Sequence, residues 1–307
     1  MPHRRLYIGT AALVAATWVL IVFGSTVRAH GAGLACPDWP LCFGEVIPPL
    51  DFGVFLEFGH RVLASVISVG FVVLSVAILR DRDARSRLGW PLAIGAVLLV
   101  TQIILGGLTV LQLLAEWTVA SHLVTGNAFC AILLVIALLA RGAPSQRTST
   151  RFGTRLAVAA VTVLLVAQLA LGGVVSSSFA GLACGPVFPQ CAGPTLAPTF
   201  SGPIGLQVMH RLLAVMLLVA ATALAGYTWR RGTVGRVAAV MAVGVLLQGA
   251  IGVANVMLAI PVEVTLLHSA GAAILVLLAT STNVAAWQAS EEPRRVGSAQ
   301  MALQGAK

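Results

Sequence analysis

Hydrophobic residues occur in eight long runs along the chain, and short polar segments separate these runs. The runs cover approximately residues 6–28, 61–80, 90–113, 117–140, 155–177, 207–228, 235–258 and 264–287. Each run approaches the ~20 residues that a helix needs to cross a hydrocarbon core of ~30 Å. The pattern therefore predicts an all-α integral membrane protein with eight transmembrane helices.

The first run follows Arg4 and Arg5, as the apolar segment of a signal peptide would. It is longer than the ~7–15 apolar residues of such a segment, and no clear small-residue cleavage site follows it. We therefore interpret this run as a retained span.

The composition agrees with a membrane protein. Hydrophobic residues make up 58% of the 307 residues and charged residues only 9%, whereas a soluble domain has about 25% charged residues. These values exclude a water-soluble globular fold and a disordered chain. The net charge of +9 would suggest a nucleic-acid partner in a soluble protein, but the positions of the basic residues argue against one.

The basic residues mark one side of the membrane. Sixteen of the 19 Lys and Arg residues lie in the N-terminus, in the C-terminal tail and in the segments 80–89, 141–155 and 229–236. Because cytoplasmic loops carry the excess of Lys and Arg, we expect a multi-pass membrane protein with both termini in the cytoplasm. The long segments 29–60 and 178–209 would then both be external.

The second half of the chain repeats features of the first at an offset of 146 to 150 residues. The repeated pairs are Gly24 and Gly172, Gly33–Cys36 and Gly181–Cys184, His60-Arg61 and His210-Arg211, Gln102 and Gln248, Gly106 and Gly252, and His122 and His268. We expect two four-helix halves, residues 1–148 and 149–307. Because each half holds an even number of spans, a pseudo-twofold axis along the membrane normal would relate them.

Four of the six histidines belong to this repeat and lie at the outer ends of the even-numbered spans. Ionisable side chains at membrane depth are costly and usually functional. Two histidines from neighbouring helices of one bundle are what bis-imidazole ligation of a haem iron requires. The sequence predicts one haem between His60 and His122. It predicts a second haem between His210 and His268.

Other roles for these residues stay open at this point. A histidine in a span can instead form an interhelical hydrogen bond. Zinc is disfavoured because no carboxylate or cysteine accompanies His210 and His268 to complete a tetrahedron. Arg61 and Arg211 each follow a candidate ligand, where the guanidinium could pair with a haem propionate or with a lipid headgroup.

One difference between the halves concerns an ionisable group. Glu57 stands three residues before His60, on the same face of a helical turn, whereas the equivalent residue in the second half is the neutral Gln207. A carboxylate beside a haem edge can act as a general base or stabilise positive charge. This difference suggests a reaction centre in the first half and a permanent cofactor in the second. The alternative is that Glu57 is a solvated residue at the end of a loop.

The two long external segments each contain a pair of cysteines. Nearby cysteines on the oxidising side of a membrane usually form disulfides, so we expect the bonds Cys36-Cys42 and Cys184-Cys191. A thiol relay at the first pair is the alternative. Cys130 lies in the middle of a span, where packing is its expected role.

Taken together, these residues resemble the haem A synthase family. The resemblance covers nearly the whole chain, and its most specific element is the decapeptide Gly33–Cys42, which is similar to the signature of the family's first external loop. The paired cysteines resemble the family's bacterial branch, which implies the plasma membrane of a prokaryote. The chain departs from the family at Ala29-His30, where small hydroxyl residues are more usual.

The resemblance implies an activity and roles for the site residues. The enzymes of this family are oxidoreductases that convert haem O into haem A for cytochrome oxidase, by stepwise oxidation of the C8 methyl to a formyl group with oxygen taken from water. The second half would hold haem b through His210 and His268. The first half would receive haem O between His60 and His122, with Glu57 near the reacting methyl.

The resemblance also implies partners, namely membrane lipid, the haem O synthase (a protohaem farnesyltransferase) that makes the substrate, and an electron acceptor. Glycine pairs such as Gly106-Gly107 indicate close helix packing within or between subunits, so a homo-oligomer stays open.

Two other functions fit the same histidines. A dihaem b-type quinol oxidoreductase would hold both haems permanently, with Glu57 accepting a quinol proton. A haem carrier or oxidase assembly factor would not need Glu57. A transporter is disfavoured, because the spans show no matching Gly or Pro breaks near the midplane.

Overall fold

The computed structural model describes residues 3–142 and 152–288. Within these ranges eight helices are long and apolar enough to cross a membrane, which confirms the predicted all-α class. The helices are α1 (Arg4–Ala29), α2 (Phe52–Arg80), α3 (Arg82–Leu111), α4 (Glu116–Arg141), α5 (Phe152–Ser177), α6 (Gly202–Thr228), α7 (Gly232–Met257) and α8 (Val262–Gln288), with a short 3-10 helix η1 (Ala180–Leu182) before α6. The basic residues predicted to be cytoplasmic in 143–151 and 289–307 lie outside the described residues.

Several helices begin well before the apolar run that predicted them. Helix α2 begins at Phe52, where the Asp51 carboxylate caps the helix by accepting a hydrogen bond from the Val54 amide at 2.8 Å. Helix α6 begins at Gly202. The apolar runs would place His60 and His210 at the start of their helices, but each lies about two turns inside the helix. In α2 the apolar run begins only after the polar residues Glu57 and His60, but the helix starts earlier because Glu57 is buried in the protein.

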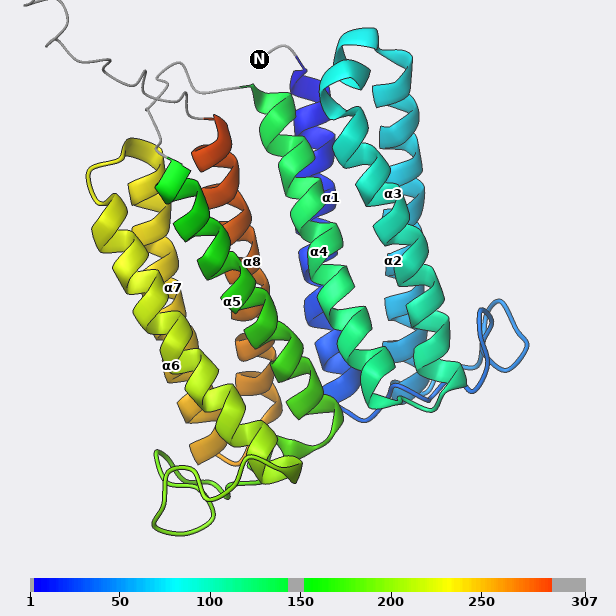
Figure 1. The fold of residues 1–307 in the computed structure, drawn as a ribbon. Coiled ribbons are helices and arrows are strands. Elements are labelled where there is room, and N and C mark those ends of the chain that lie inside the picture. The colour runs from blue at the N-terminus through cyan, green and yellow to red at the C-terminus, as the bar shows by residue number, and fades with distance from the viewer. Residues whose placement is uncertain (1–2, 143–151, 289–307) are drawn as a thin grey trace, which may run out of the picture.

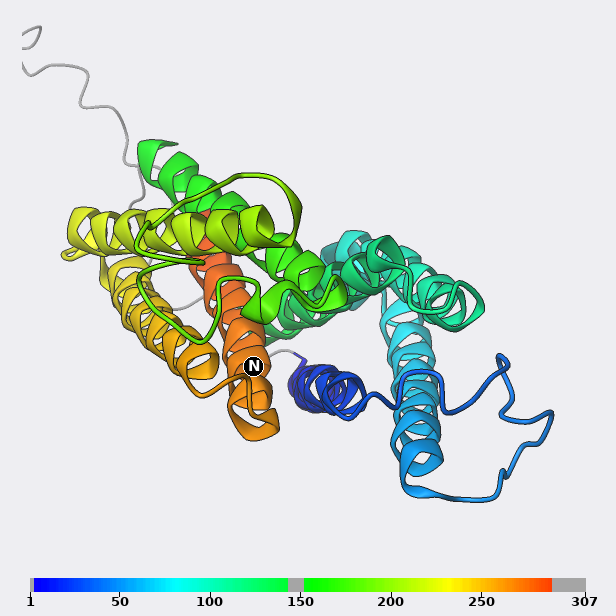
Figure 2. The same ribbon diagram turned by 90° about the horizontal axis from the view of Figure 1, so that it is seen from below.

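The helices are arranged as two groups of four, α1–α4 and α5–α8, shown side by side in Figure 1 and from the end in Figure 2. Within each group every helix contacts its neighbours along the chain, and the first helix also contacts the last. The contacts between the groups come from the four inner helices α1, α4, α5 and α8. The outer helices α2 and α6 therefore contact only their own group.

Each group has its own buried apolar core. Phe71 of α2 and Phe129 of α4 meet edge to face in the first core, with ring centroids 5.4 Å apart. In the second core, Met241 of α7 packs among residues of α5, α6 and α8. Hydrogen bonds also join the groups: the Trp18 indole donates to the Ala270 carbonyl at 3.2 Å, and the Arg28 guanidinium donates to the Ser176 carbonyl at 2.7 Å.

Hydroxyl side chains within the spans form hydrogen bonds to their own helix. Thr10 and Thr17 of α1 are buried and donate to the carbonyls four residues earlier, at 2.6 and 2.7 Å. This arrangement gives the Thr10 and Thr17 hydroxyl protons an acceptor where water is absent.

The long connections that hold the cysteine pairs lie at the same end of the molecule. Figure 1 shows the loop after α1 and the loop after α5 at the lower end, whereas α1 starts and α8 finishes at the upper end. Both cysteine loops therefore cover the helix ends that carry the histidines.

Candidate functional site

A glycine of the preceding helix lies against each of the four histidines. A Cβ atom at Gly24 would lie 3.0 Å from Nε2 of His60, and one at Gly172 would lie 3.0 Å from Cε1 of His210. The same relation joins Gly106 to His122 at 3.5 Å and Gly252 to His268 at 3.0 Å. Each glycine thus provides the space that an imidazole ring occupies between two helices.

Each predicted pair lies within one group of four helices. His60 of α2 and His122 of α4 belong to the first group, and His210 of α6 and His268 of α8 belong to the second. The buried Nδ1 atoms of His122 and His210 have no hydrogen-bond partner among the described residues. Each pair therefore contains one buried ring nitrogen without a partner, which fits a ligand of a haem iron.

The donor set does not fit a bare metal ion. In the part of the chain that the structure describes, no group of three or more His, Cys, Asp or Glu side chains gathers around one point. A structural zinc ion takes four protein ligands and a catalytic one three, so the pairs fit an iron whose other ligands come from a porphyrin.

Glu57 is buried beside the first histidine pair, with 5% of its surface exposed. Its Oε2 accepts a hydrogen bond from the Cys36 amide at 2.8 Å, and its Oε1 accepts one from the Arg61 guanidinium at 2.5 Å. The alternative of a solvated residue at a loop end is therefore wrong. The carboxylate is held from two directions, by the first cysteine loop and by its own helix.

Gln207 occupies the equivalent place in the second half and has different partners. It is also buried, at 3% exposure, and its amide nitrogen donates to the Gly181 carbonyl at 3.1 Å. Its Oε1 has no hydrogen-bond partner among the described residues. The second half therefore has a neutral amide at the position where the first half has the ion pair between Glu57 and Arg61.

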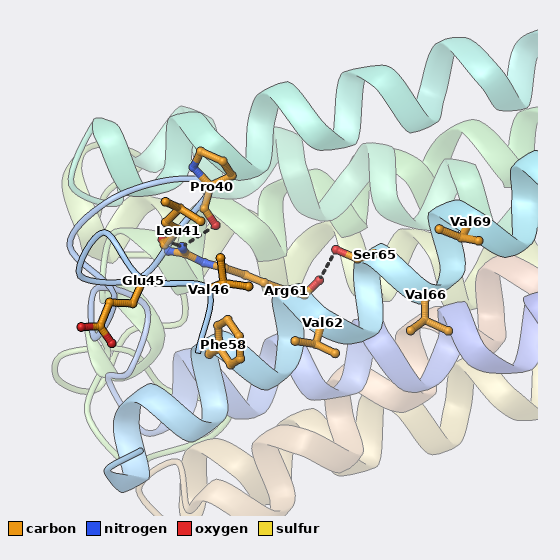
Figure 3. Close-up of a pocket in the computed structure, with 10 residues that line it drawn as sticks. All are labelled: Pro40, Leu41, Glu45, Val46, Phe58, Arg61, Val62, Ser65, Val66 and Val69. Atoms are coloured by element: carbon orange, nitrogen blue, oxygen red, sulfur yellow. Dashed lines mark hydrogen bonds between the residues drawn. The ribbon is translucent and has the colours of Figure 1, made fainter. Parts of the chain in front are cut away.

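Arg61 holds the first cysteine loop onto α2. Besides Glu57, its guanidinium donates to the carbonyls of Asp38 at 2.8 Å and Leu41 at 2.6 Å, and more weakly to that of Pro40. Figure 3 shows this contact at the head of a groove of about 490 Å³ that follows the outer face of α2 along Val62, Ser65, Val66 and Val69. No histidine lines this groove.

Arg211 repeats this arrangement on α6. Its guanidinium donates to the carbonyls of Val187 at 3.1 Å and Gln190 at 2.9 Å, and it stacks over the Phe188 ring at 5.6 Å from the centroid. Both predicted propionate ligands are thus engaged with loop carbonyls in the structure. Their contact with a propionate stays a prediction.

Both predicted disulfides are present, Cys36-Cys42 and Cys184-Cys191, and Cys130 is a buried free thiol. The first disulfide closes a turn in which the Asp38 carboxylate accepts hydrogen bonds from the amides of Gly44 at 2.8 Å and Phe43 at 2.7 Å. These amides lower the pKa of Asp38 below its ordinary value of 3.8.

The chain matches the model of the COX15-CtaA family, described as cytochrome oxidase assembly protein, over residues 4–52 and 50–280. The chain belongs to this family. The match covers both cysteine loops and all four histidines, so it confirms the family that the sequence motifs indicated.

Relatives of this COX15-CtaA chain include the heme A synthase of Shewanella oneidensis, which is 29% identical over 91% of this chain and 96% of that protein. The heme A synthase of Brucella anthropi is 27% identical over 89% of this chain and 88% of that protein. The heme A synthase of Symbiobacterium thermophilum is 31% identical over 65% of this chain and 67% of that protein.

Sequence reasoning missed three contacts of the site. These are the Cys36 amide on Glu57, the Gln168 amide nitrogen 3.4 Å from His210 Nε2, and the Gln248 amide nitrogen 3.1 Å from His268 Nδ1. The repeat of Gln102 at Gln248 was a signal for the last of these. Nothing in the repeat pointed to Gln168, because its counterpart at the same offset is Leu20.

Proposed function

We propose that this chain is a haem A synthase, a membrane oxidoreductase that converts haem O into haem A for cytochrome oxidase. The observation that carries the proposal is the placement of a buried carboxylate, Glu57, one helical turn before one histidine of a pair, in a chain whose family and relatives have this activity.

The substrate, haem O, would bind in the first half with its iron between His60 and His122. The space at Gly24 and Gly106 and the unpartnered Nδ1 of His122 support this assignment. Oxidation of a methyl group to a formyl group removes four electrons and four protons and adds one oxygen atom, which water supplies. The electrons pass to an acceptor in the membrane, and the haem O synthase supplies the substrate.

The second half would hold haem b through His210 and His268. Haem b bound there supplies one-electron transfer between the first half and the acceptor. The residues of this half present no ionisable carboxylate to the site, since Gln207 stands where Glu57 stands in the first half. This difference supports chemistry in the first half alone.

Glu57 would act on protons and charge at the reacting methyl. Its carboxylate accepts a proton from the substrate or from an attacking water, or it stabilises positive charge on the carbon. Arg61 and the Cys36 amide fix the carboxylate oxygens, so that little reorganisation is needed when charge develops. The disulfide loop above the site limits the access of bulk water.

The test is expression in a host that makes haem O but not haem A, followed by haem extraction and mass analysis. The wild type is expected to form haem A, and Glu57→Gln is expected to form none while it still binds haem. Gln207→Glu is the matched control and is expected to keep haem A formation.

If the wild type forms no haem A and purifies with two equivalents of haem b, the chain is a dihaem electron-transfer protein instead. If Glu57→Gln still forms haem A, the role of the carboxylate is wrong even though the activity is present.

The chain would lie in a prokaryotic plasma membrane with both cysteine loops outside. Their shared end of the molecule and the basic segments at the opposite end support this orientation. Labelling of a single cysteine introduced into either loop, in intact cells, tests it.

A further inference from the structure

Arg28 of α1 has no role in the proposed function, although it lies on the face of the helix that meets His60. It follows Gly24 by one turn, and a Cβ atom at Gly24 would lie 3.0 Å from His60 Nε2. Residues four positions apart share one face of a helix, and long side chains of a helix lean toward its N-terminus. The Arg28 side chain therefore starts over the turn that contacts His60.

The Arg28 guanidinium lies where the two groups of helices meet. Its Nη2 donates to the Ser176 carbonyl at 2.7 Å, and its Cζ lies 4.4 Å from the centroid of the Phe179 ring. Its Nε is buried and has no hydrogen-bond partner in the part of the chain that the structure describes. A buried donor on a charged group is costly to leave unpaired, so this nitrogen favours an anionic acceptor that the chain itself does not supply.

The other two arginines at this end of the molecule already have acceptors. Both terminal nitrogens of Arg61 donate, to loop carbonyls and to Glu57. Both terminal nitrogens of Arg211 donate to carbonyls of the second cysteine loop. A carboxylate at either residue competes with these contacts, whereas Nε of Arg28 can donate to a carboxylate while Nη2 keeps the Ser176 carbonyl.

The second half has no cation at the equivalent position. At an offset of 148 residues, Gly24 corresponds to Gly172 and Arg28 corresponds to Ser176. The arginine of the first half thus contacts the residue that replaces it in the second. The repeat therefore gives the first half a charge next to its histidine that the second half lacks.

We propose that Arg28 is a positioning residue that binds a propionate of the haem substrate in the first half. The propionates are the charged part of a haem, so they favour the water-facing end of the helices over the hydrocarbon core, and Arg28 lies at the end of α1 that the first cysteine loop follows. The C8 methyl is next to a propionate on the porphyrin ring, so a cation that holds this edge also places the methyl relative to Glu57. The inference rests on the proposed function, because it takes the first half as the haem O site.

The experiment compares two probes, haem b and haem b dimethyl ester, in which both propionates are neutral. Each is added to protein purified from a host that makes no haem O, and an optical titration gives the affinity of the first half. The wild type is expected to bind the free acid ~10–100-fold more tightly than the ester. Arg28→Gln is expected to lose most of this preference by weakening the binding of the acid alone, and Arg28→Lys, which keeps the charge without the planar fork, is expected to lie between the two.

Phe179→Leu is the matched control, since it removes the stacking partner of Arg28 and leaves the guanidinium in place. It is expected to keep the wild-type preference for the acid. Thermal unfolding shows whether each variant is folded.

The outcomes separate the two proposals. If His60→Ala and His122→Ala leave the binding of added haem b unchanged, the haem site lies elsewhere and the proposed function fails at that point. If these variants abolish that binding but folded Arg28→Gln keeps the wild-type preference for the acid, the propionate role is wrong and the haem assignment stands. Equal weakening of acid and ester in Arg28→Gln also overturns the propionate role, because it would show that Arg28 acts through the packing of the two halves.

Discussion

Arg61 and Glu57 lie one turn apart on α2 and form an ion pair at 2.5 Å, in which both side chains are largely buried. The same guanidinium donates to carbonyls of the first cysteine loop. One arginine therefore links the fold of an external loop to the orientation of the proposed catalytic carboxylate. In the second half Arg211 keeps the loop contacts, but Gln207 forms no ion pair with it.

Replacement of Arg61 should damage both the loop and the carboxylate. Hydrogen bonds to charged groups contribute ~1.5–3 kcal/mol each, so Arg61→Ala is expected to lower the melting temperature and to abolish haem A formation. Arg61→Lys keeps the positive charge but lacks the planar guanidinium that donates to several acceptors at once. This variant should retain only part of the activity. Arg211→Lys is the control and should lower stability with a smaller effect on the reaction. Equal activity losses in both lysine variants would contradict the link through Glu57.

The two disulfides should differ in their effect on the reaction but not in their effect on stability. They join residues six and seven positions apart, so loop-closure entropy assigns about 2 kcal/mol to each. The Cys36 amide holds Glu57, whereas no contact of this kind joins a carboxylate to the second bond. Replacing Cys36 and Cys42 by serine should therefore reduce haem A formation well below the level seen when Cys184 and Cys191 are replaced. Thermal unfolding and haem extraction on the same preparations check this.

Added methyl groups at the glycines that face the histidines should displace the rings. In Gly24→Ala the new Cβ would meet His60 Nε2 at 3.0 Å, so the affinity of the first half for added haem is expected to fall by about tenfold or more. Gly9→Ala lies in the same helix with nothing within 4 Å of its Cβ, and it should bind haem like the wild type. An optical titration with haem b measures both variants. Unchanged binding in Gly24→Ala would show that the glycine is not part of the site.

Asp38 should stabilise the first cysteine loop only while it is ionised. Hydrogen bonds from the Gly44 and Phe43 amides lower the pKa of its carboxyl group below 3.8 in the folded protein. The unfolded chain therefore takes up the proton first as the pH falls, so this contribution is complete above pH 3.8 and is lost at lower pH. Melting temperatures of the wild type and Asp38→Asn should differ at neutral pH and converge below that value. A difference that stays constant down to the lowest pH would contradict the assignment.

The repeat allowed much of this site to be predicted from the sequence. Eight apolar runs predicted the spans, and the glycine that faces each of the four histidines also recurs in the repeat. The pairing of the histidines stays a prediction. The starts of the helices could not be predicted as well. The turns from Phe52 to His60 contain polar residues that face the protein, so the apolar run begins later than the helix. The Cys36 contact with Glu57 depends on how a loop folds back over 21 residues. Gln168 was missed because its counterpart in the first half is Leu20, so the internal repeat gave no signal for it.

Each histidine pair joins an inner helix to an outer one. His122 and His268 lie on α4 and α8, which contact helices of the other group. His60 and His210 lie on α2 and α6, which contact helices of their own group on one side and face away from the protein on the other. A flat, lipid-soluble molecule would therefore reach each histidine pair from the bilayer on the side of an outer helix, without parting the halves. The arginine contacts hold the external ends of those two helices to the disulfide loops, so the loops border that side of each site.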